Sequence, residues 1–415
     1  MSYWDLILRK LLYLSTLTLI FIVPWEDSIS TANIGSLARL IGFAVAGLWL
    51  ATIIAEGKFR KPHLFHALVL LFFLWNILSM FWSADTNGTL QRIKTYGQLF
   101  LLMLIYWDVF REAEKLRAGI QAYILGAYVL VASTVYNFLL GKTAVAYEGR
   151  YSATGVNAVD AALILMIGLP MATHLFFAAR TDALGVLQKV TNLLFIPLSL
   201  FTIILTGSRT SLIAIIPFGI FILGTRQIKV NQKFFIFTIL LIASMVFLPL
   251  IPQSVIGRLE TIGTSISAAD LGGRVNLWRE GIAVLAAHPL LGIGGGAIDK
   301  TIGSAVHNTF ISVATETGFV GFILFLFILG LVVYKAVKLP GGTSELWLAV
   351  FMVWAIGVLS LSWEFRKITW IMMSFVIIAS SLERKADTAV KTAEYSEKSR
   401  RPIESGESLT RPKAI

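Results

Sequence analysis

Apolar runs separated by short polar segments fill almost the whole chain. A run of about 20 apolar residues is long enough for a helix to cross a bilayer core of about 30 Å. The runs predict twelve membrane-spanning helices, at residues 6–24, 34–55, 63–82, 93–110, 117–139, 158–179, 190–206, 210–225, 234–252, 318–338, 345–363 and 367–382. The expected fold class is therefore an all-α integral membrane protein, with nine spans in residues 1–252 and three in residues 318–382.

A long polar segment at residues 253–317 interrupts this pattern. Within it, residues 275–287 place Trp278 and other apolar side chains on one side, which predicts an amphipathic helix. A further helix is expected to begin near His307, ahead of the membrane, and Gly318 is expected to mark the membrane edge or a bend. The segment is therefore expected to form a loop that contains short helices.

The distribution of basic residues predicts the orientation of the spans. If the N-terminus lies inside, the inner segments before the tail carry fifteen Lys and Arg, whereas the short outer segments carry eight. Cytoplasmic loops hold an excess of Lys and Arg, so both termini are expected in the cytoplasm and the 253–317 loop in the periplasm. The last segment, residues 383–415, is charged and Ser-rich, and we expect a disordered tail because it lacks apolar residues to bury.

Composition agrees with a membrane protein. Hydrophobic residues make up 56% of the chain and charged residues 14%, where about 25% is usual for soluble proteins. The net charge of +11 is explained by membrane orientation rather than by a nucleic-acid surface. The absence of cysteine excludes disulfides and thiolate metal sites.

Several arginines remain on the outer side against the positive-inside bias, among them Arg150, Arg209 and Arg274. An arginine near the bilayer is costly unless it reaches the interface or meets an anion. Guanidinium binds phosphate oxygens in a bidentate manner and stays charged at any relevant pH. Arg209 and Arg274 are therefore candidate phosphate ligands; the alternative is that they reach lipid head groups or pair with acidic neighbours.

His307 is expected at the outer membrane face, in the same loop as Arg274, and is one of five histidines. A neutral imidazole can take the proton of a hydroxyl near pH 7, so His307 is a candidate general base. The alternative is a structural role at the helix start together with Asn308. The outer segments contain no HExxH, no Asp-x-Asp pair and no carboxylate cluster at ligand spacing, so neither a metal nor another cofactor is expected.

The motifs around these residues resemble the O-antigen ligase and polymerase superfamily, whose members move glycans from a polyprenyl diphosphate to an acceptor hydroxyl. The motifs that carry the resemblance are Trp82-Ser83-Ala84-Asp85, Arg150 with Gly155 and Asn157, Gly207-Ser208-Arg209, Gly273-Arg274 with Trp278, His288-Pro289 with Gly292 and Gly294, and His307-Asn308 with Glu316, Gly318 and Gly321.

The resemblance implies a metal-independent, inverting transfer of a glycan from undecaprenyl diphosphate at the periplasmic face of a bacterial inner membrane. Arg209 and Arg274 would hold the diphosphate, and His307 would deprotonate the acceptor. Residues implied in binding substrate are Arg150, Asn157, Trp278, Asn308 and Glu316. The implied partners are the lipid-linked glycan donor, the acceptor and membrane lipids, with no nucleic acid.

The motifs do not distinguish two outcomes of this chemistry. A ligase transfers the glycan to a lipid A core sugar, and this is the interpretation we favour. A polymerase transfers it to the next repeat unit of an O-antigen, capsule or exopolysaccharide, and this is the alternative. A lipid-linked sugar transporter is a more remote alternative, because transporters place ionisable groups deep in the bilayer, whereas here the candidate groups gather at the outer edge.

Overall fold

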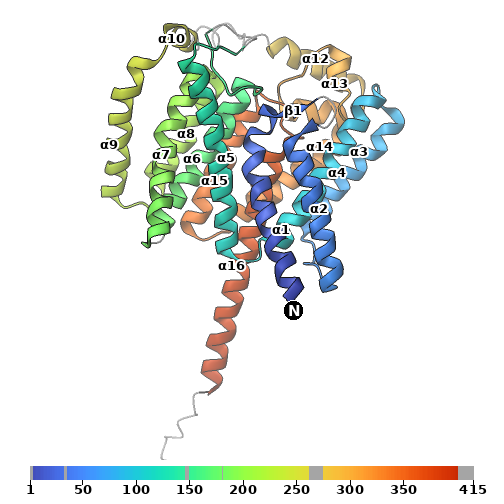
Figure 1. The fold of residues 1–415 in the computed structure, drawn as a ribbon. Helices are drawn as coiled ribbons and strands as arrows, with labels where there is room; N and C mark the ends of the chain where they lie inside the picture. Colours follow the sequence, from blue (N-terminus) through green and yellow to red (C-terminus); the bar gives the residue numbers. More distant parts are fainter. Residues whose placement is uncertain (1–2, 32–34, 145–148, 180, 261–273, 401–415) are drawn as a thin grey trace, which may run out of the picture.

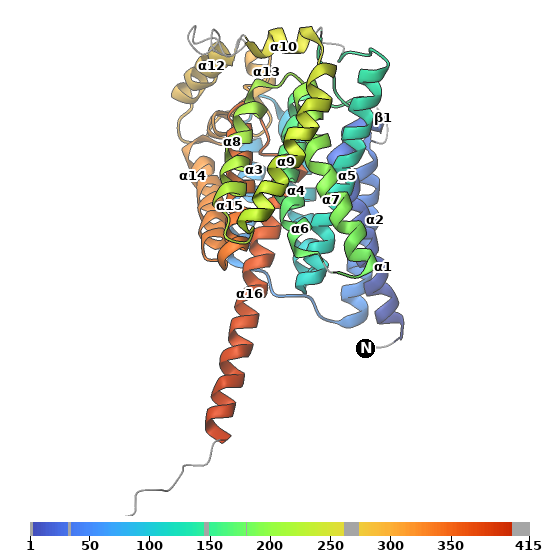
Figure 2. The ribbon, with the colours of Figure 1, turned by 90° about the vertical axis from the view of Figure 1, so that its left-hand side faces the viewer.

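The computed structural model describes residues 3–31, 35–144, 149–179, 181–260 and 274–400, which form a bundle of helices (Figure 1). The long helices are α1 (Tyr3–Ile22), α2 (Leu37–Glu56), α3 (Leu64–Leu78), α4 (Thr86–Val109), α5 (Ala113–Leu139), α6 (Ala158–Ala178), α7 (Ala183–Leu205), α8 (Arg209–Gly224), α9 (Val230–Phe247), α14 (Thr309–Val337), α15 (Gly341–Val358) and α16 (Lys367–Arg400). Three short helices, α10 (Gln253–Glu260), α12 (Arg274–Ala287) and α13 (Ile298–Ile302), lie together at one end of the bundle (Figures 1 and 2).

Extended structure in the described residues is limited to β1 (Ser30–Thr31) and β2 (Gly35–Ser36), which form a two-stranded antiparallel pair. Short 3-10 turns, η1 (Val23–Ser28), η2 (Ser79–Trp82) and η3 (Leu248–Leu250), extend α1, α3 and α9. The prediction of an all-α integral membrane protein is confirmed.

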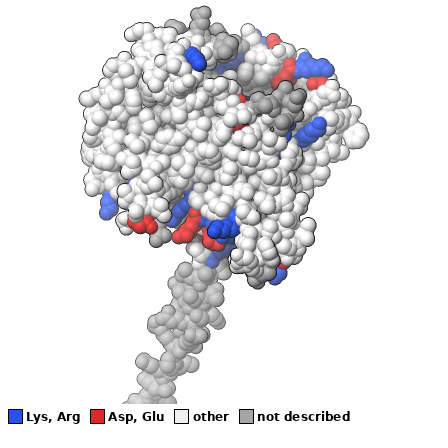
Figure 3. Space-filling model, in the orientation of Figure 1, with Lys and Arg blue, Asp and Glu red and all other residues white. Residues whose placement is uncertain are grey.

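Nine of the described helices, counted with their 3-10 extensions, are long and apolar enough to cross a membrane: α1, α2, α3, α5, α6, α7, α9, α14 and α15. The other three predicted spans correspond to α8, which has only 16 residues, and to α4 and α16, which are more polar. On the face in Figure 3 the charged residues gather toward the two ends and leave the middle uncharged. That arrangement is typical of a protein surrounded by hydrocarbon.

The prediction for the C-terminal tail is wrong in part. Helix α16 continues through residues 383–400, where disorder was expected, and residues 401–415 lie outside the described residues. This segment is rich in Ala, Glu, Lys and Arg, which favour helix. Because the membrane part of α16 is already helical, the added turns avoid the cost of nucleation. A low apolar content excludes a packed core, but it does not exclude the extension of an existing helix.

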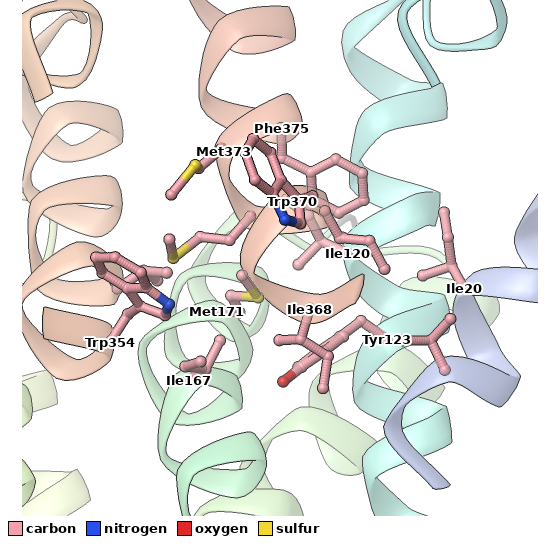
Figure 4. Close-up of a cluster of buried hydrophobic side chains, with 14 of the residues drawn as sticks. Ile20, Ile120, Tyr123, Ile167, Met171, Trp354, Ile368, Trp370, Met373 and Phe375 are labelled. Carbon is pink, nitrogen blue, oxygen red and sulfur yellow. The ribbon is translucent and has the colours of Figure 1, made fainter. Parts of the chain in front are cut away.

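The most buried of the nine candidate spans is α6, which packs against α5, α7, α8 and α15. Its most apolar 18 residues are 78% buried, whereas those of the span built on α9 are 6% buried. Figure 4 shows part of the surrounding core, in which Tyr123, Met171, Trp354 and Trp370 are at most 2% exposed. A helix that is apolar on all sides is stable inside a protein core or in the bilayer, and α6 is largely enclosed by protein. The neighbouring helices therefore fix the position of its N-terminal residues.

Helix α14 bends at Gly318, as the sequence predicted. Gly318 has φ 63° and ψ −175°, a conformation that is essentially restricted to glycine. The loop after α12 packs against this break: the amide of Phe319 donates to the carbonyl of Pro289 at 2.8 Å, and a Cβ on Gly318 would collide with the carbonyl of Leu290. The missing side chain therefore lets the loop and the helix approach each other.

Replacing Gly318 by alanine is expected to lower the melting temperature of the detergent-purified protein. The substitution adds backbone strain of about 1–3 kcal/mol as well as the steric collision. Gly330→Ala is the matched control: it lies in the same helix, has no atom within 4 Å of an added Cβ, and should be neutral or slightly stabilising. Equal melting temperatures for the two variants would contradict the assigned role of the bend.

Candidate functional site

A cavity of about 290 Å³ lies at the end of the bundle that carries α10 and α12 (Figure 1). It brings together five of the eight residues that the sequence analysis selected: Arg150, Asn157, Arg209, Arg274 and His307. The remaining lining residues are Val159, Gly207, Ser208, Thr210, Arg258, Leu277 and Leu361. Segments that are distant in the sequence therefore form one site.

Several helices begin at this cavity. Asn157 caps α6, where its side chain accepts a hydrogen bond from the amide of Val159 at 2.8 Å. Ser208 caps α8, and His307 immediately precedes the residue that caps α14. The N-terminus of a helix carries a partial positive charge and amides that bind anions. The backbone therefore adds to the attraction that the arginines exert on an anion.

The turn between α7 and α8 organises the arginine side chains. Arg150 is 3% exposed, and its Nε donates to the carbonyl of Thr206 at 2.7 Å. The Nε of Arg258 donates to the carbonyl of Gly207 at 3.3 Å, and the Nε of Arg209 donates to the carbonyl of Arg258 at 3.4 Å. The guanidinium groups are thus held by backbone carbonyls at one corner of the cavity.

Arginine is the main charged residue of the described cavity lining. The described lining includes four arginines, and none of the described lining residues is Asp or Glu. Guanidinium stays charged at any relevant pH and binds phosphate oxygens in a bidentate manner. The described residues also contain no group of three or more His, Asp or Glu that could hold a metal ion. The chemistry that the lining offers is recognition of a multiply charged anion such as a diphosphate.

His307 has an unusual backbone conformation. Its φ of 53° is the only positive value at a non-glycine residue in the described part of the chain. Histidine adopts this region more often than most residues, but such a backbone still carries strain, and strain of this kind gathers at functional sites. The strained residue is the one that brings an imidazole to the arginine cavity.

The pKa of His307 is lowered, first by burial and then by the positive charge of Arg274. Asp160 and Asp299 oppose this shift without cancelling it. The imidazole is therefore neutral at pH 7 and able to accept a proton. It makes no hydrogen bond to another described residue, so its ring nitrogens are available to a substrate.

The other three selected residues do not line the cavity. Trp278 packs against the small apolar cluster around α13 and so anchors α12. Asn308 caps α14 by accepting from the amides of Phe310 and Ile311, at 3.0 and 3.1 Å. Glu316 is 1% exposed and is not among the residues that line the cavity.

Arg258 is the cavity residue that the sequence analysis did not select. It lies on α10 and lines the cavity. The topology predicted from Lys and Arg places it on the outer side, against the positive-inside bias. The same signal that selected Arg209 and Arg274 was therefore present at Arg258. No family motif included it, and its closeness to Arg209 comes from the fold.

The fold and the cavity define an integral membrane protein with a cationic site at one end of its helical bundle. Residues 194–326 match the family model described as O-Antigen ligase, a region that includes Arg209, Arg258, Arg274 and His307. A curated relative, the "Exopolysaccharide production protein ExoQ" of Rhizobium meliloti (strain 1021), is 25% identical over 314 residues, covering 69% of this chain and 69% of the relative. Both matches support the O-antigen ligase and polymerase superfamily and confirm the resemblance seen in the motifs.

The cationic cavity is expected to bind inorganic pyrophosphate, and Arg274→Gln or Arg209→Gln should weaken that binding about 10- to 100-fold. This range corresponds to about 1.5–3 kcal/mol for a hydrogen bond to a charged group. Isothermal titration calorimetry on the detergent-purified protein measures the affinity. Lysine at either position should restore only part of it, because ammonium cannot form a bidentate contact.

The matched control is Arg279→Gln. Arg279 lies on the same helix as Arg274, but it is exposed, bonds to Asn276 at 3.2 Å, and does not line the cavity. Pyrophosphate affinity should stay at the wild-type value. An equal loss at Arg279 and Arg274 would mean that the protein attracts pyrophosphate through its general charge and not through this cavity.

Proposed function

We propose that this protein is an inverting, metal-independent membrane glycosyltransferase that moves a glycan from undecaprenyl diphosphate to a sugar hydroxyl of an acceptor. The observation that carries the proposal is the single cavity that joins four arginines to a neutral His307. The match to the O-antigen ligase family model, over a region that holds most of these residues, supports it.

In the proposed reaction, the acceptor oxygen attacks the anomeric carbon of the donor sugar. The bond between that carbon and the diphosphate oxygen breaks, and His307 takes the proton of the attacking hydroxyl. A single displacement inverts the configuration at the anomeric carbon. Negative charge grows on the departing diphosphate, and fixed guanidinium groups stabilise it without reorganisation. Arg209 and Arg274 are the proposed principal ligands, with Arg150 and Arg258 beside them.

Arginine, rather than a metal ion, is the proposed source of this stabilisation. Four guanidinium groups line the cavity, and they would supply the positive charge that a divalent cation would otherwise bring to the diphosphate. The helix N-termini at the same cavity also carry partial positive charge, which favours binding of the diphosphate.

Two acceptors fit this chemistry, and a different observation favours each. The description of the matching family model favours a ligase, which would use a lipid A core sugar. The name of the relative ExoQ favours a polymerase, which would use the growing end of an exopolysaccharide. A purified enzyme given labelled donor and each acceptor in parallel distinguishes the two, since only the correct acceptor becomes labelled.

We propose that the cavity faces the periplasm of a bacterium and that both termini lie in the cytoplasm. The bias of Lys and Arg toward the opposite end supports this orientation. In Figure 1 the N-terminus and the projecting part of α16 lie at the same end, opposite α10 and α12, as an even number of spans requires.

If His307 is the general base, His307→Asn should reduce turnover about 10²- to 10⁴-fold. Asparagine is the informative replacement, because it tolerates the positive φ of this position whereas alanine adds backbone strain. Pyrophosphate binding and melting temperature should stay at wild-type values, and EDTA should not change wild-type turnover. Wild-type turnover in His307→Asn would refute the base assignment.

The dependence of kcat/KM on pH is expected to show an acid limb with its midpoint below 6.5. The base is active when neutral, so activity rises with pH through its pKa. Burial and Arg274 lower that pKa from its usual value near 6.5, so the limb moves to lower pH. The residual activity of His307→Asn should lack this limb. A midpoint above 6.5 in the wild type would assign the limb to another group.

A further inference from the structure

A buried ion triad lies among residues that do not line the cavity. The guanidinium of Arg92, on α4, contacts Glu316 of α14 at 3.3 Å and Glu364, between α15 and α16, at 3.2 Å. Arg92 is 9% exposed and the two glutamates are at most 1% exposed. The guanidinium also lies 4.0 Å from the centroid of the Phe365 ring.

Stability alone is a poor explanation for this triad. Transfer of three charges out of water is costly, and apolar residues of similar volume often stabilise a protein as well or better. The cluster contains one guanidinium and two carboxylates, so it carries a net negative charge when both carboxylates are ionised. What such a cluster does supply is fixed geometry, because each group has few alternative partners in a buried environment.

Glu364 connects the triad to the helix turn that follows His307. Its Oε1 accepts from Ser312 at 2.9 Å, one turn into α14. The neighbouring residues make the same connection through the backbone: Thr309 donates to the carbonyl of Leu361 at 2.8 Å and accepts from the amide of Trp363 at 2.8 Å. Leu361 itself lines the cavity.

Glu316 connects the triad to the loop that leads toward His307. Its carbonyl accepts from the amide of Gly294 at 2.9 Å, and the preceding carbonyl, of Thr315, accepts from the amide of Ile293 at 3.1 Å. On its other side the loop is held by Ser79, whose Oγ accepts from the amide of Gly295 at 3.2 Å. The loop is therefore fixed between α14 and the end of α3.

We propose that Arg92, Glu316 and Glu364 are positioning residues for His307. The triad joins two segments that lie on either side of His307 in the sequence. They are the loop at residues 293–297, which comes before α13, and the first turns of α14. The triad thereby holds the strained backbone that aims the imidazole at the acceptor. This inference rests on the proposed function of His307 as the base, and it replaces the expected substrate-binding role of Glu316.

The test uses Glu364→Gln, which keeps the size of the side chain and an oxygen for Ser312 but removes the charge. Turnover should fall by up to about 10²-fold, the loss that a misplacement of about 1 Å can cause, while pyrophosphate affinity in the arginine cavity stays unchanged. The matched control is Glu56→Gln, which removes one carboxylate from the Arg9 ion pair at the opposite end of the bundle. Its turnover should remain at the wild-type value.

A double variant separates positioning from general stability. If Glu364 acts through His307, adding Glu364→Gln to His307→Asn should cost less than twofold further turnover, measured with labelled donor in single-turnover conditions. Residues that act as a unit are non-additive in this way. If the two losses multiply, or if pyrophosphate affinity falls together with turnover, the positioning role is overturned.

Arg92→Lys is the second variant, and it tests the positioning role of the triad even if Glu364→Gln does not fold. Lysine keeps the buried charge but cannot contact both carboxylates with a planar fork, so turnover should again fall with pyrophosphate affinity retained. Full turnover in Arg92→Lys or Glu364→Gln, with His307→Asn inactive, overturns this inference and leaves the proposed function standing. Wild-type turnover in His307→Asn overturns the proposed function instead.

Discussion

The concentration of fixed positive charge at one end of an apolar bundle is the constraint on which the other features of the site depend. Four arginines share one cavity, with no acidic residue among its described lining residues. Carbonyls of the α7–α8 turn hold two of these side chains, because Arg150 donates to the carbonyl of Thr206 and Arg258 donates to the carbonyl of Gly207. Helices α7 and α8 both pack against α6, which is largely buried.

The helical spans could be predicted from the sequence because the hydrocarbon core allows few alternatives. A spanning backbone must satisfy its hydrogen bonds internally, so each long apolar run has to be a helix. The bend at Gly318 could be predicted for a similar reason, since a glycine at the junction of a polar loop and an apolar helix allows a break. The helix at residues 383–400 could not be predicted in this way. Low apolar content does not exclude a helix that continues from a membrane span.

The site was predicted in part. Arg209 and Arg274 could be selected because arginine is unusual at the membrane edge that the Lys and Arg bias predicts to be outer, and His307 because a neutral imidazole can act as a base. The fold brings all three to one cavity. The partners of Arg92 could not be found this way. Glu316 and Glu364 lie 224 and 272 residues beyond Arg92 in the chain. A local sequence pattern cannot predict a contact over such a separation. Trp278, Asn308 and Glu316 stand in the same motifs, yet a motif does not distinguish a side chain that faces the cavity from one that supports it.

The motif around His307 includes residues that do not line the cavity, such as Asn308 and Glu316, and these residues hold the backbone near the imidazole. A residue at φ 53° keeps that conformation only if the chain on both sides is fixed. On one side, the loop from Gly292 approaches α14 so closely that a Cβ on Gly292 would lie 2.5 Å from the backbone of Glu316. On the other, Asn308 caps the helix and donates to the carbonyl of Leu359 at 3.3 Å. Glycines that permit close approach and polar groups that fix the turn therefore act on the same backbone, and together they place the imidazole in the cavity before any substrate binds.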